Sequence, residues 1–134
     1  MAEPPLRPGR PWQRELASFG FALKGIRTAL TTEPHLRFHA LAAGLVVAVG
    51  LGLPLTRHDW ALLALAIGAV WTAELLNTAL ETLVNLVSPE FHPLAGRVKD
   101  VAAGAVLVTA LAAAAVGLLV LGPPLWAWAL SWLS

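Results

Sequence analysis

Apolar residues fill three long runs of this chain. Residues 38–55 and 101–121 contain no Asp, Glu, Lys or Arg, and residues 60–87 contain only Glu74 and Glu81. A helix needs about 17 to 25 mostly apolar residues to cross the hydrocarbon core of a membrane, and each run is long enough. The pattern therefore predicts three transmembrane helices.

Proline-containing segments mark the ends of these helices. Pro54 closes the first run, residues 88–89 (SP) close the second, and residues 122–124 (GPP) close the third. Proline favours a helix end because it lacks an N–H donor and restricts the residue before it. Asp59 is expected to be the N-cap of the second helix, since a carboxylate there accepts a hydrogen bond from the first turn.

Residues 12–32 show a different pattern, with apolar residues at every third or fourth position. These residues are Leu16, Phe19, Leu23, Ile26 and Leu30. Such spacing places them on one face of a helix, while the basic residues of the segment fall outside that face. The segment is predicted to lie on the membrane surface as an amphipathic helix.

Composition agrees with this pattern. Of the 134 residues, 57% are hydrophobic and 13% are charged, against about 25% charged in a typical soluble domain. The mean hydropathy is +0.71. The absence of cysteine excludes disulfides and thiolate metal sites, and a net charge of +1 gives no indication of nucleic-acid binding. The expected fold is an all-α integral membrane protein with three transmembrane helices plus an N-terminal amphipathic surface helix.

The distribution of charge and tryptophan gives an expected organisation. Six of the nine Lys and Arg residues precede the first run, one lies in the first connection and two lie in the second. The positive-inside rule then places the N-terminus and the second connection in the cytoplasm. We expect a disordered lead-in at residues 1–11, a membrane domain at 12–122 and a tryptophan-rich interfacial tail at 123–134.

A stripe of polar residues interrupts the second run. Its members are Glu74, Asn77, Thr78, Glu81 and Asn85. Their spacing keeps them within about a quarter-turn of one another on a helix. If Trp60 marks the outer interface, Glu74 lies roughly 21 Å along the helix, in the cytoplasmic third of the hydrocarbon core, and Glu81 and Asn85 lie near its boundary. Lys99 and Asp100, just before the third run, are expected at that same level.

Residue chemistry leaves three interpretations of this stripe open: proton or ion translocation, metal-dependent group transfer, and tight oligomer packing. A solvated cytoplasmic rim accounts for Glu81, Asn85, Lys99 or Asp100 taken singly, and helix association accounts for Asn77. Glu74 is harder to explain in this way, because a charge deep in a span costs on the order of 3 kcal/mol and usually faces a partner or a water-filled site. The P-loop pattern GxxxxGK[ST] is absent, so an ATP site would have to be of another kind.

Two segments resemble one known family. The run AELLNTALETLVNLVSPEFHPLAGRVKDVAAGAV, residues 73–106, is similar to the signature of prokaryotic diacylglycerol kinases, small integral membrane kinases that include undecaprenol kinases. The upstream run FALKGIRTALTTEPHLRFH, residues 21–39, resembles the surface helix of that family and the acidic residue that follows it. The likeness extends over roughly residues 17–122. It implies a bacterial inner-membrane enzyme, with an N-terminus and active site in the cytoplasm, that transfers the γ-phosphate of ATP to diacylglycerol or undecaprenol.

The resemblance also implies roles for individual residues. Glu74 matches the proposed general base, and Glu33 and Glu81 match the acids that hold Mg²⁺. Asn77, Lys99 and Asp100 match further active-site positions. Nucleotide-side contacts are implied at Arg14, Phe21, Lys24, Asn85, Glu90, Phe91, His92, Lys99 and Asp100. Family members form homotrimers with sites at subunit contacts, so the expected partners are ATP, a lipid alcohol and further copies of the chain.

Some residues depart from the family pattern. Asn85 stands where aspartate is usual, and Phe21 and Phe91 stand where tyrosine is often found. His39 and the segment SPEFHPLAGRVKD, residues 88–100, resemble the undecaprenol kinase branch more than the enterobacterial diacylglycerol kinase. We nevertheless interpret His35 and His39 as interfacial residues rather than as metal ligands, because they follow Pro34 at the membrane entry and form no ligand pair with supporting acids. The alternatives to an active kinase are a small proton- or ion-coupled transport subunit and a catalytically weakened family member.

Overall fold

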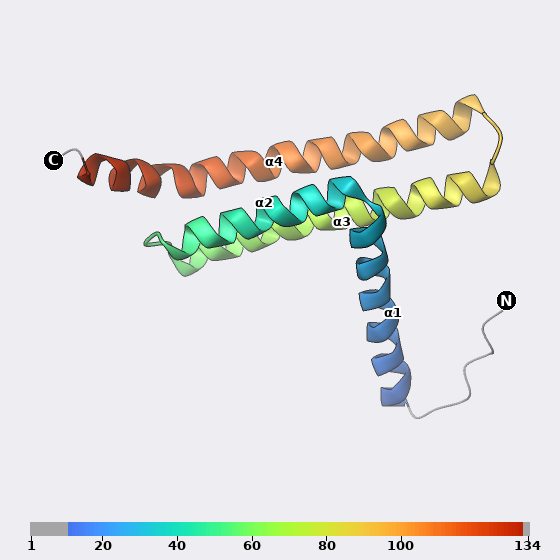
Figure 1. Ribbon diagram of the computed structural model, residues 1–134, viewed down its shortest axis with the longest axis horizontal. Helices are drawn as coiled ribbons and strands as arrows, with labels where there is room; N and C mark the ends of the chain where they lie inside the picture. Colours follow the sequence, from blue (N-terminus) through green and yellow to red (C-terminus); the bar gives the residue numbers. More distant parts are fainter. Residues whose placement is uncertain (1–10, 133–134) are drawn as a thin grey trace.

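The computed structural model describes residues 11–132, which form four helices (Figure 1). They are α1 (Pro11–Thr32), α2 (Pro34–Leu51), α3 (Arg57–Val87) and α4 (Pro93–Ser131). Three of them, α2, α3 and α4, are long and apolar enough to cross a membrane. The predicted fold class is confirmed. The lead-in predicted at residues 1–11 lies, apart from Pro11, outside the described residues.

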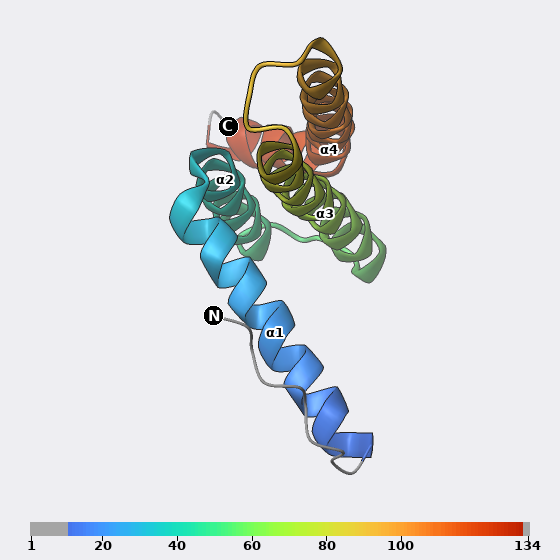
Figure 2. The same ribbon diagram turned by 90° about the vertical axis from the view of Figure 1, so that its right-hand side faces the viewer.

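The three long helices lie side by side, and α1 leads away from them across their direction (Figures 1 and 2). Most of the packing is between α3 and α4, while α2 lies against α3. At about 1.5 Å per residue, α2 is roughly 27 Å long, α3 roughly 46 Å and α4 roughly 58 Å. The α3–α4 hairpin therefore extends well past the corner between α1 and α2, as Figure 1 shows.

The helix α1 exposes its apolar stripe. Leu16, Phe19 and Leu23 are exposed, whereas Ile26 and Leu30, nearer to α2, are partly buried. In water this exposure would be unfavourable, but on a membrane surface the stripe can insert at the boundary between headgroups and acyl chains. The exposed stripe therefore fits the surface helix predicted from the sequence.

The turn between α2 and α3 corrects two predictions. The helix α2 ends at Leu51 rather than at residue 55, and the N-cap of α3 is Thr56 rather than Asp59. Asp59 occupies the third helical position, where its Oδ2 accepts the Thr56 N–H at 2.8 Å, while the Asp59 N–H donates to Thr56 Oγ1 at 3.2 Å. These reciprocal bonds form a capping box, so a hydroxyl caps the helix and the carboxylate supports the cap.

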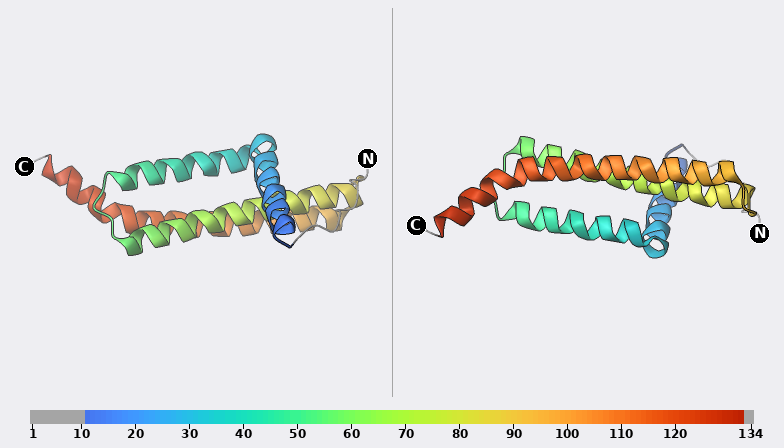
Figure 3. Two further views of the ribbon diagram at one scale, coloured as in Figure 1. Left: turned by 90° about the horizontal axis from the view of Figure 1, so that it is seen from below. Right: turned by 90° about the horizontal axis from the view of Figure 1, so that it is seen from above.

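The helix α4 corrects a third prediction, because it begins at Pro93 and continues through Pro123 and Pro124 to Ser131. The segment predicted to end the last span is instead helical, with a bend in α4 towards its C-terminal end (Figure 3). An apolar helix tolerates internal proline when it can bend around the missing hydrogen bond. Trp126 and Trp128 of the predicted tail thus lie on α4, and Trp132 is its C-cap residue. The rings of Trp128 and Trp132 make an edge-to-face contact with their centroids 5.8 Å apart.

The buried core is small and lies towards the end of α3 that adjoins α2's C-terminus. Leu63 of α3 packs with Val120 and Leu121 of α4, and partly buried residues of α2 and of the α2–α3 turn surround them. Many large apolar side chains on the three long helices remain exposed. This distribution suits helices whose outer faces contact lipid, since lipid chains are as apolar as the side chains themselves.

Candidate active site

Glu74 is the buried carboxylate of the bundle. Its residue surface is 4% exposed, and every other buried side chain identified among the described residues is apolar. Its Oε1 lies 3.1 Å from Nε2 of His39 on α2. The pair connects two helices within an apolar environment, in which an ionised carboxylate requires a hydrogen-bond donor or an opposite charge.

The position of His39 differs from the sequence-based interpretation. We expected His35 and His39 to be interfacial, but His39 turns inward to Glu74, and only His35 is exposed. Depth along the two helices matches the levels of His39 and Glu74 but does not by itself identify their contact. His39 lies five residues inside α2, roughly 8 Å from the helix start, and this depth matches a carboxylate in the cytoplasmic third of the core.

Asn77 and Glu81 form a second polar unit on the same face of α3. The Asn77 Nδ2 donates to Glu81 Oε1 at 2.9 Å, across one turn of the helix. The Asn77 Oδ1 is buried, and no hydrogen-bond donor reaches it within the described part of the chain. A buried oxygen without a donor costs about 1 to 3 kcal/mol, and a hard cation would satisfy it.

The carboxylate oxygens of Glu81 and the amide oxygen of Asn77 are of the kind that Mg²⁺ prefers as ligands. Glu33 is the second acid that was predicted to bind the ion. Glu33 is the N-cap residue of α2, at the corner with α1, and its Oε1 accepts a hydrogen bond from the Thr32 hydroxyl at 3.2 Å. Over residues 11–132, no three His or acidic side chains gather into a metal-binding group. Mg²⁺ is commonly held by one or two carboxylates together with substrate phosphates and water, so a nucleotide-borne ion does not need a larger protein cluster.

Asn85 and Lys99 connect α3 to α4 in the projecting part of the hairpin. The Lys99 Nζ donates to Asn85 Oδ1 at 2.7 Å. This contact confirms that the two helices bring Lys99 and Asn85 to one level. Asp100, the next residue of α4, is exposed.

The remaining predicted nucleotide residues lie on two separate elements. Phe21 and Lys24 are exposed on α1, and the side chain of Arg14 falls outside the described portion of that helix. Glu90, Phe91 and His92 lie in or beside the connection that follows α3, where the His92 Nδ1 caps α4 by accepting the Leu94 N–H at 3.2 Å. These two elements diverge in Figure 1, so a single chain does not gather all the predicted residues around Glu74.

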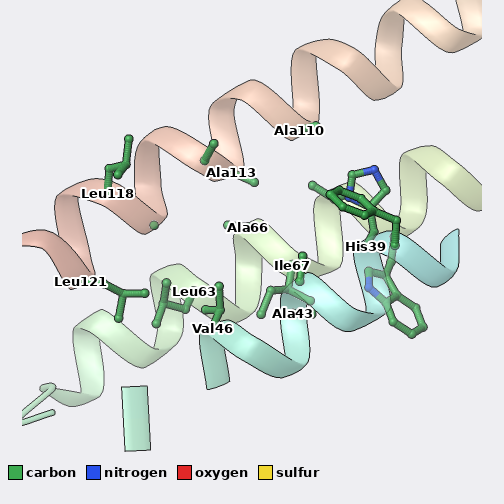
Figure 4. Close-up of a pocket in the computed structure, with 16 residues that line it drawn as sticks. His39, Ala43, Val46, Leu63, Ala66, Ile67, Ala110, Ala113, Leu118 and Leu121 are labelled. Carbon is green, nitrogen blue, oxygen red and sulfur yellow. The ribbon is translucent and has the colours of Figure 1, made fainter. Parts of the chain in front are cut away.

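An apolar groove ends beside the buried pair. It has a volume of about 510 Å³ and is lined by α2, α3 and α4. Figure 4 shows His39 at one end and Leu118 and Leu121 towards the other, with Ala113 on the α4 side between them. The lining is apolar except for His39 and Trp71. The groove could therefore hold a hydrocarbon chain with one end at His39, the partner of Glu74.

Comparison with known proteins identifies the family. Residues 20–121 match the family described as prokaryotic diacylglycerol kinase. The chain belongs to this family. It is 42% identical over 112 residues to the undecaprenol kinase of Bacillus subtilis, covering 84% of this chain and 91% of the relative. It is 42% identical over 128 residues to a diacylglycerol kinase of Synechocystis, covering 92% and 73%. An Escherichia coli diacylglycerol kinase is 32% identical over 100 residues, covering 75% and 82%.

The protein is accordingly a lipid kinase of a bacterial membrane, as its sequence predicted. The family match includes Glu33, the whole polar stripe of α3, and both Lys99 and Asp100, but it begins after Arg14. ATP-dependent phosphoryl transfer generally requires a metal ion to neutralise the charge that develops on the phosphates. No feature of the described helices favours the transport subunit considered above.

Proposed function

We propose that this kinase transfers the γ-phosphate of ATP to the hydroxyl of diacylglycerol or undecaprenol, with Glu74 as the general base. The observation that carries the proposal is the buried Glu74, whose partner His39 lines one end of an apolar groove. A lipid chain in the groove would bring its headgroup hydroxyl towards the His39–Glu74 pair. The carboxylate would then accept the hydroxyl proton as the oxygen attacks the γ-phosphorus, and the bond from that phosphorus to the bridging oxygen of ADP would break so that ADP leaves.

The proposed phosphate side of the site lies further along α3. Glu81 and Glu33 would hold Mg²⁺ against the ATP phosphates, with Asn77 Oδ1 as a neutral oxygen beside them. Lys99 and Asp100 would contact the nucleotide, assisted by Asn85 and the exposed residues of α1 and of the α3–α4 connection. Seven residues separate Glu74 from Glu81, roughly 10 Å along the helix, so base and metal would approach the reacting phosphate from different levels.

In this proposal, the lipid and the nucleotide would reach the site from opposite sides of the membrane boundary. ATP and Mg²⁺ would reach the projecting α3–α4 hairpin from the cytoplasm, as the excess of Lys and Arg before the first span indicates. The lipid would enter laterally from the bilayer. A homotrimer would complete the site, because the predicted nucleotide residues of one chain lie on diverging elements. Detection of monomers alone by native mass spectrometry of the active protein would count against the trimer.

The substrate is tested with purified protein, γ-labelled ATP, Mg²⁺ and parallel mixed micelles of diacylglycerol and undecaprenol. We expect label in at least one lipid, with the relative rates identifying the preferred one. If neither lipid acquires label while the protein conducts protons across liposomes without ATP turnover, the proposed function is wrong.

A further inference from the structure

We propose that His39 is a positioning residue that holds Glu74 in its reactive orientation. The inference rests on the proposed role of Glu74 and adds a residue to which no role was assigned by sequence. The imidazole would donate its Nε2–H to Glu74 Oε1 across 3.1 Å, which is hydrogen-bonding distance. Oε2 would then be the oxygen that accepts the lipid hydroxyl proton.

Burial makes this contact more important than a similar contact at the surface. The side chains of His39 and Glu74 are 19% and 6% exposed, so little water is available to replace the imidazole. No other hydrogen bond to the Glu74 carboxylate is found among residues 11–132. A glutamate has three side-chain torsions, and a donor on a second helix restricts all of them at once.

The two helices hold the partners at a fixed separation. Leu36 is fully buried one turn before His39, and Val70 is buried one turn before Glu74. Each partner thus follows a buried apolar residue on the same helix, and close packing at these residues resists rotation of either helix. The rings of His39 and Phe38 also meet edge-on with their centroids 5.6 Å apart, and this contact further limits the orientations open to the imidazole.

His39 lies between the groove that would hold the lipid and Glu74, the proposed base. It lies at the end of the apolar groove and touches Glu74, so a lipid chain in the groove would reach the imidazole before the carboxylate. A purely structural role would join α2 to α3 without affecting the chemical step. The two roles differ in their kinetic consequences.

The test compares His39→Ala and His39→Gln with His35→Ala, a control on the same helix whose side chain is exposed. Misplacing a reacting group by about 1 Å can reduce a rate by about 100-fold, so we expect His39→Ala to lower kcat by about 10- to 100-fold. The KM for ATP should change by no more than roughly twofold, because uniform binding of the nucleotide is unaffected. His39→Gln should recover much of kcat, since its amide retains an N–H donor.

Combination with Glu74→Gln separates positioning from packing. If His39 acts through Glu74, the double variant should be no slower than Glu74→Gln alone. Multiplied losses, or a folded His39→Ala protein with unchanged kcat, would overturn the inference. So would a His39→Gln protein that is folded but as slow as His39→Ala. A wild-type protein that labels neither lipid would instead refute the proposed function, and this inference with it.

Discussion

Glu74 and Glu81 share one face of α3, but their surroundings suit them to different tasks. Glu74 is buried and meets a histidine of another helix, whereas Glu81 is half-buried and accepts a hydrogen bond from Asn77 on its own helix. A carboxylate in an apolar site can act as a base, while one near solvent with a free neighbouring oxygen suits a hard cation. Environment therefore distinguishes two residues of the same type.

Substitution of Glu81 tests the metal assignment. We predict that Glu81→Gln raises the Mg²⁺ concentration at half-maximal activity by about tenfold or more, because even outer-shell changes at metal sites weaken affinity by about 10- to 100-fold. Mg²⁺ titrations at saturating ATP measure this shift. Glu15→Gln, an exposed change on α1, serves as the charge-matched control. Superimposable titrations for the two variants would exclude Glu81 as a ligand.

Much of the polar stripe was predictable from sequence, but the partner of Glu74 was not. Helical spacing placed Glu74, Asn77 and Glu81 on one face, and the Asn77–Glu81 bond follows from that spacing. The His39 contact also depends on the rotation of α2 about its own axis. Because α2 is apolar on nearly all sides, its hydrophobic pattern does not define that rotation.

At the scale of the element, helix ends determine where the site lies. The capping box at Thr56 starts α3, and Gly50 permits Trp60 of α3 to approach α2 closely. A Cβ built on Gly50 would lie 3.0 Å from the Trp60 ring and 3.1 Å from Leu55. These contacts hold α2 against α3 at the turn between them. His39 and Glu74 pair on the same two helices, further from that turn.

A valine at this position should loosen the hairpin. We predict that Gly50→Val destabilises the protein by about 1 to 3 kcal/mol, the usual cost of overpacking. Gly44→Val is the matched control, because a Cβ at Gly44 meets no atom within 4 Å. Thermal unfolding in detergent, followed by circular dichroism, should show a lower midpoint for Gly50→Val than for Gly44→Val. Equal midpoints would refute the packing role of Gly50.

Sequence rules identified each helix but misplaced several ends. The apolar runs gave α2, α3 and α4, and the proline pair at 123–124 wrongly ended the last of them. The rule failed because the residues beyond the prolines are good helix formers, and a backbone in an apolar environment satisfies its polar groups best as a helix. Asp59 was recognised as a capping residue, but Thr56 three positions earlier was the better N-cap.

At the scale of the whole molecule, the three long helices line the groove. The α3–α4 hairpin extends past the corner between α1 and α2 (Figure 1). The apolar runs and the low share of charged residues together predicted the membrane fold. The groove was not predictable, since it depends on the small residues of α4 that happen to face α2 and α3. Its position connects the bilayer to the buried pair.

Filling the groove should impair lipid use selectively. We predict that Ala113→Phe, within the lining, raises the KM for the lipid by about tenfold, in line with the 1 to 3 kcal/mol cost of overpacking. The KM for ATP should stay within about twofold, because the residues proposed to bind the nucleotide do not line the groove. Ala112→Phe introduces the same ring on an exposed face and is the control. An unchanged lipid KM in Ala113→Phe would show that the groove does not hold the substrate chain.

The most direct test of the account is the transfer of labelled γ-phosphate to lipid by Glu74→Gln. The substitution preserves shape and removes only the basic oxygen, so the variant should fold, as circular dichroism and gel filtration in detergent would verify. We predict a loss in kcat of about 100-fold or more, the usual contribution of a general base, with little change in the KM for ATP. A folded Glu74→Gln protein that phosphorylates lipid at the wild-type rate would contradict the central claim.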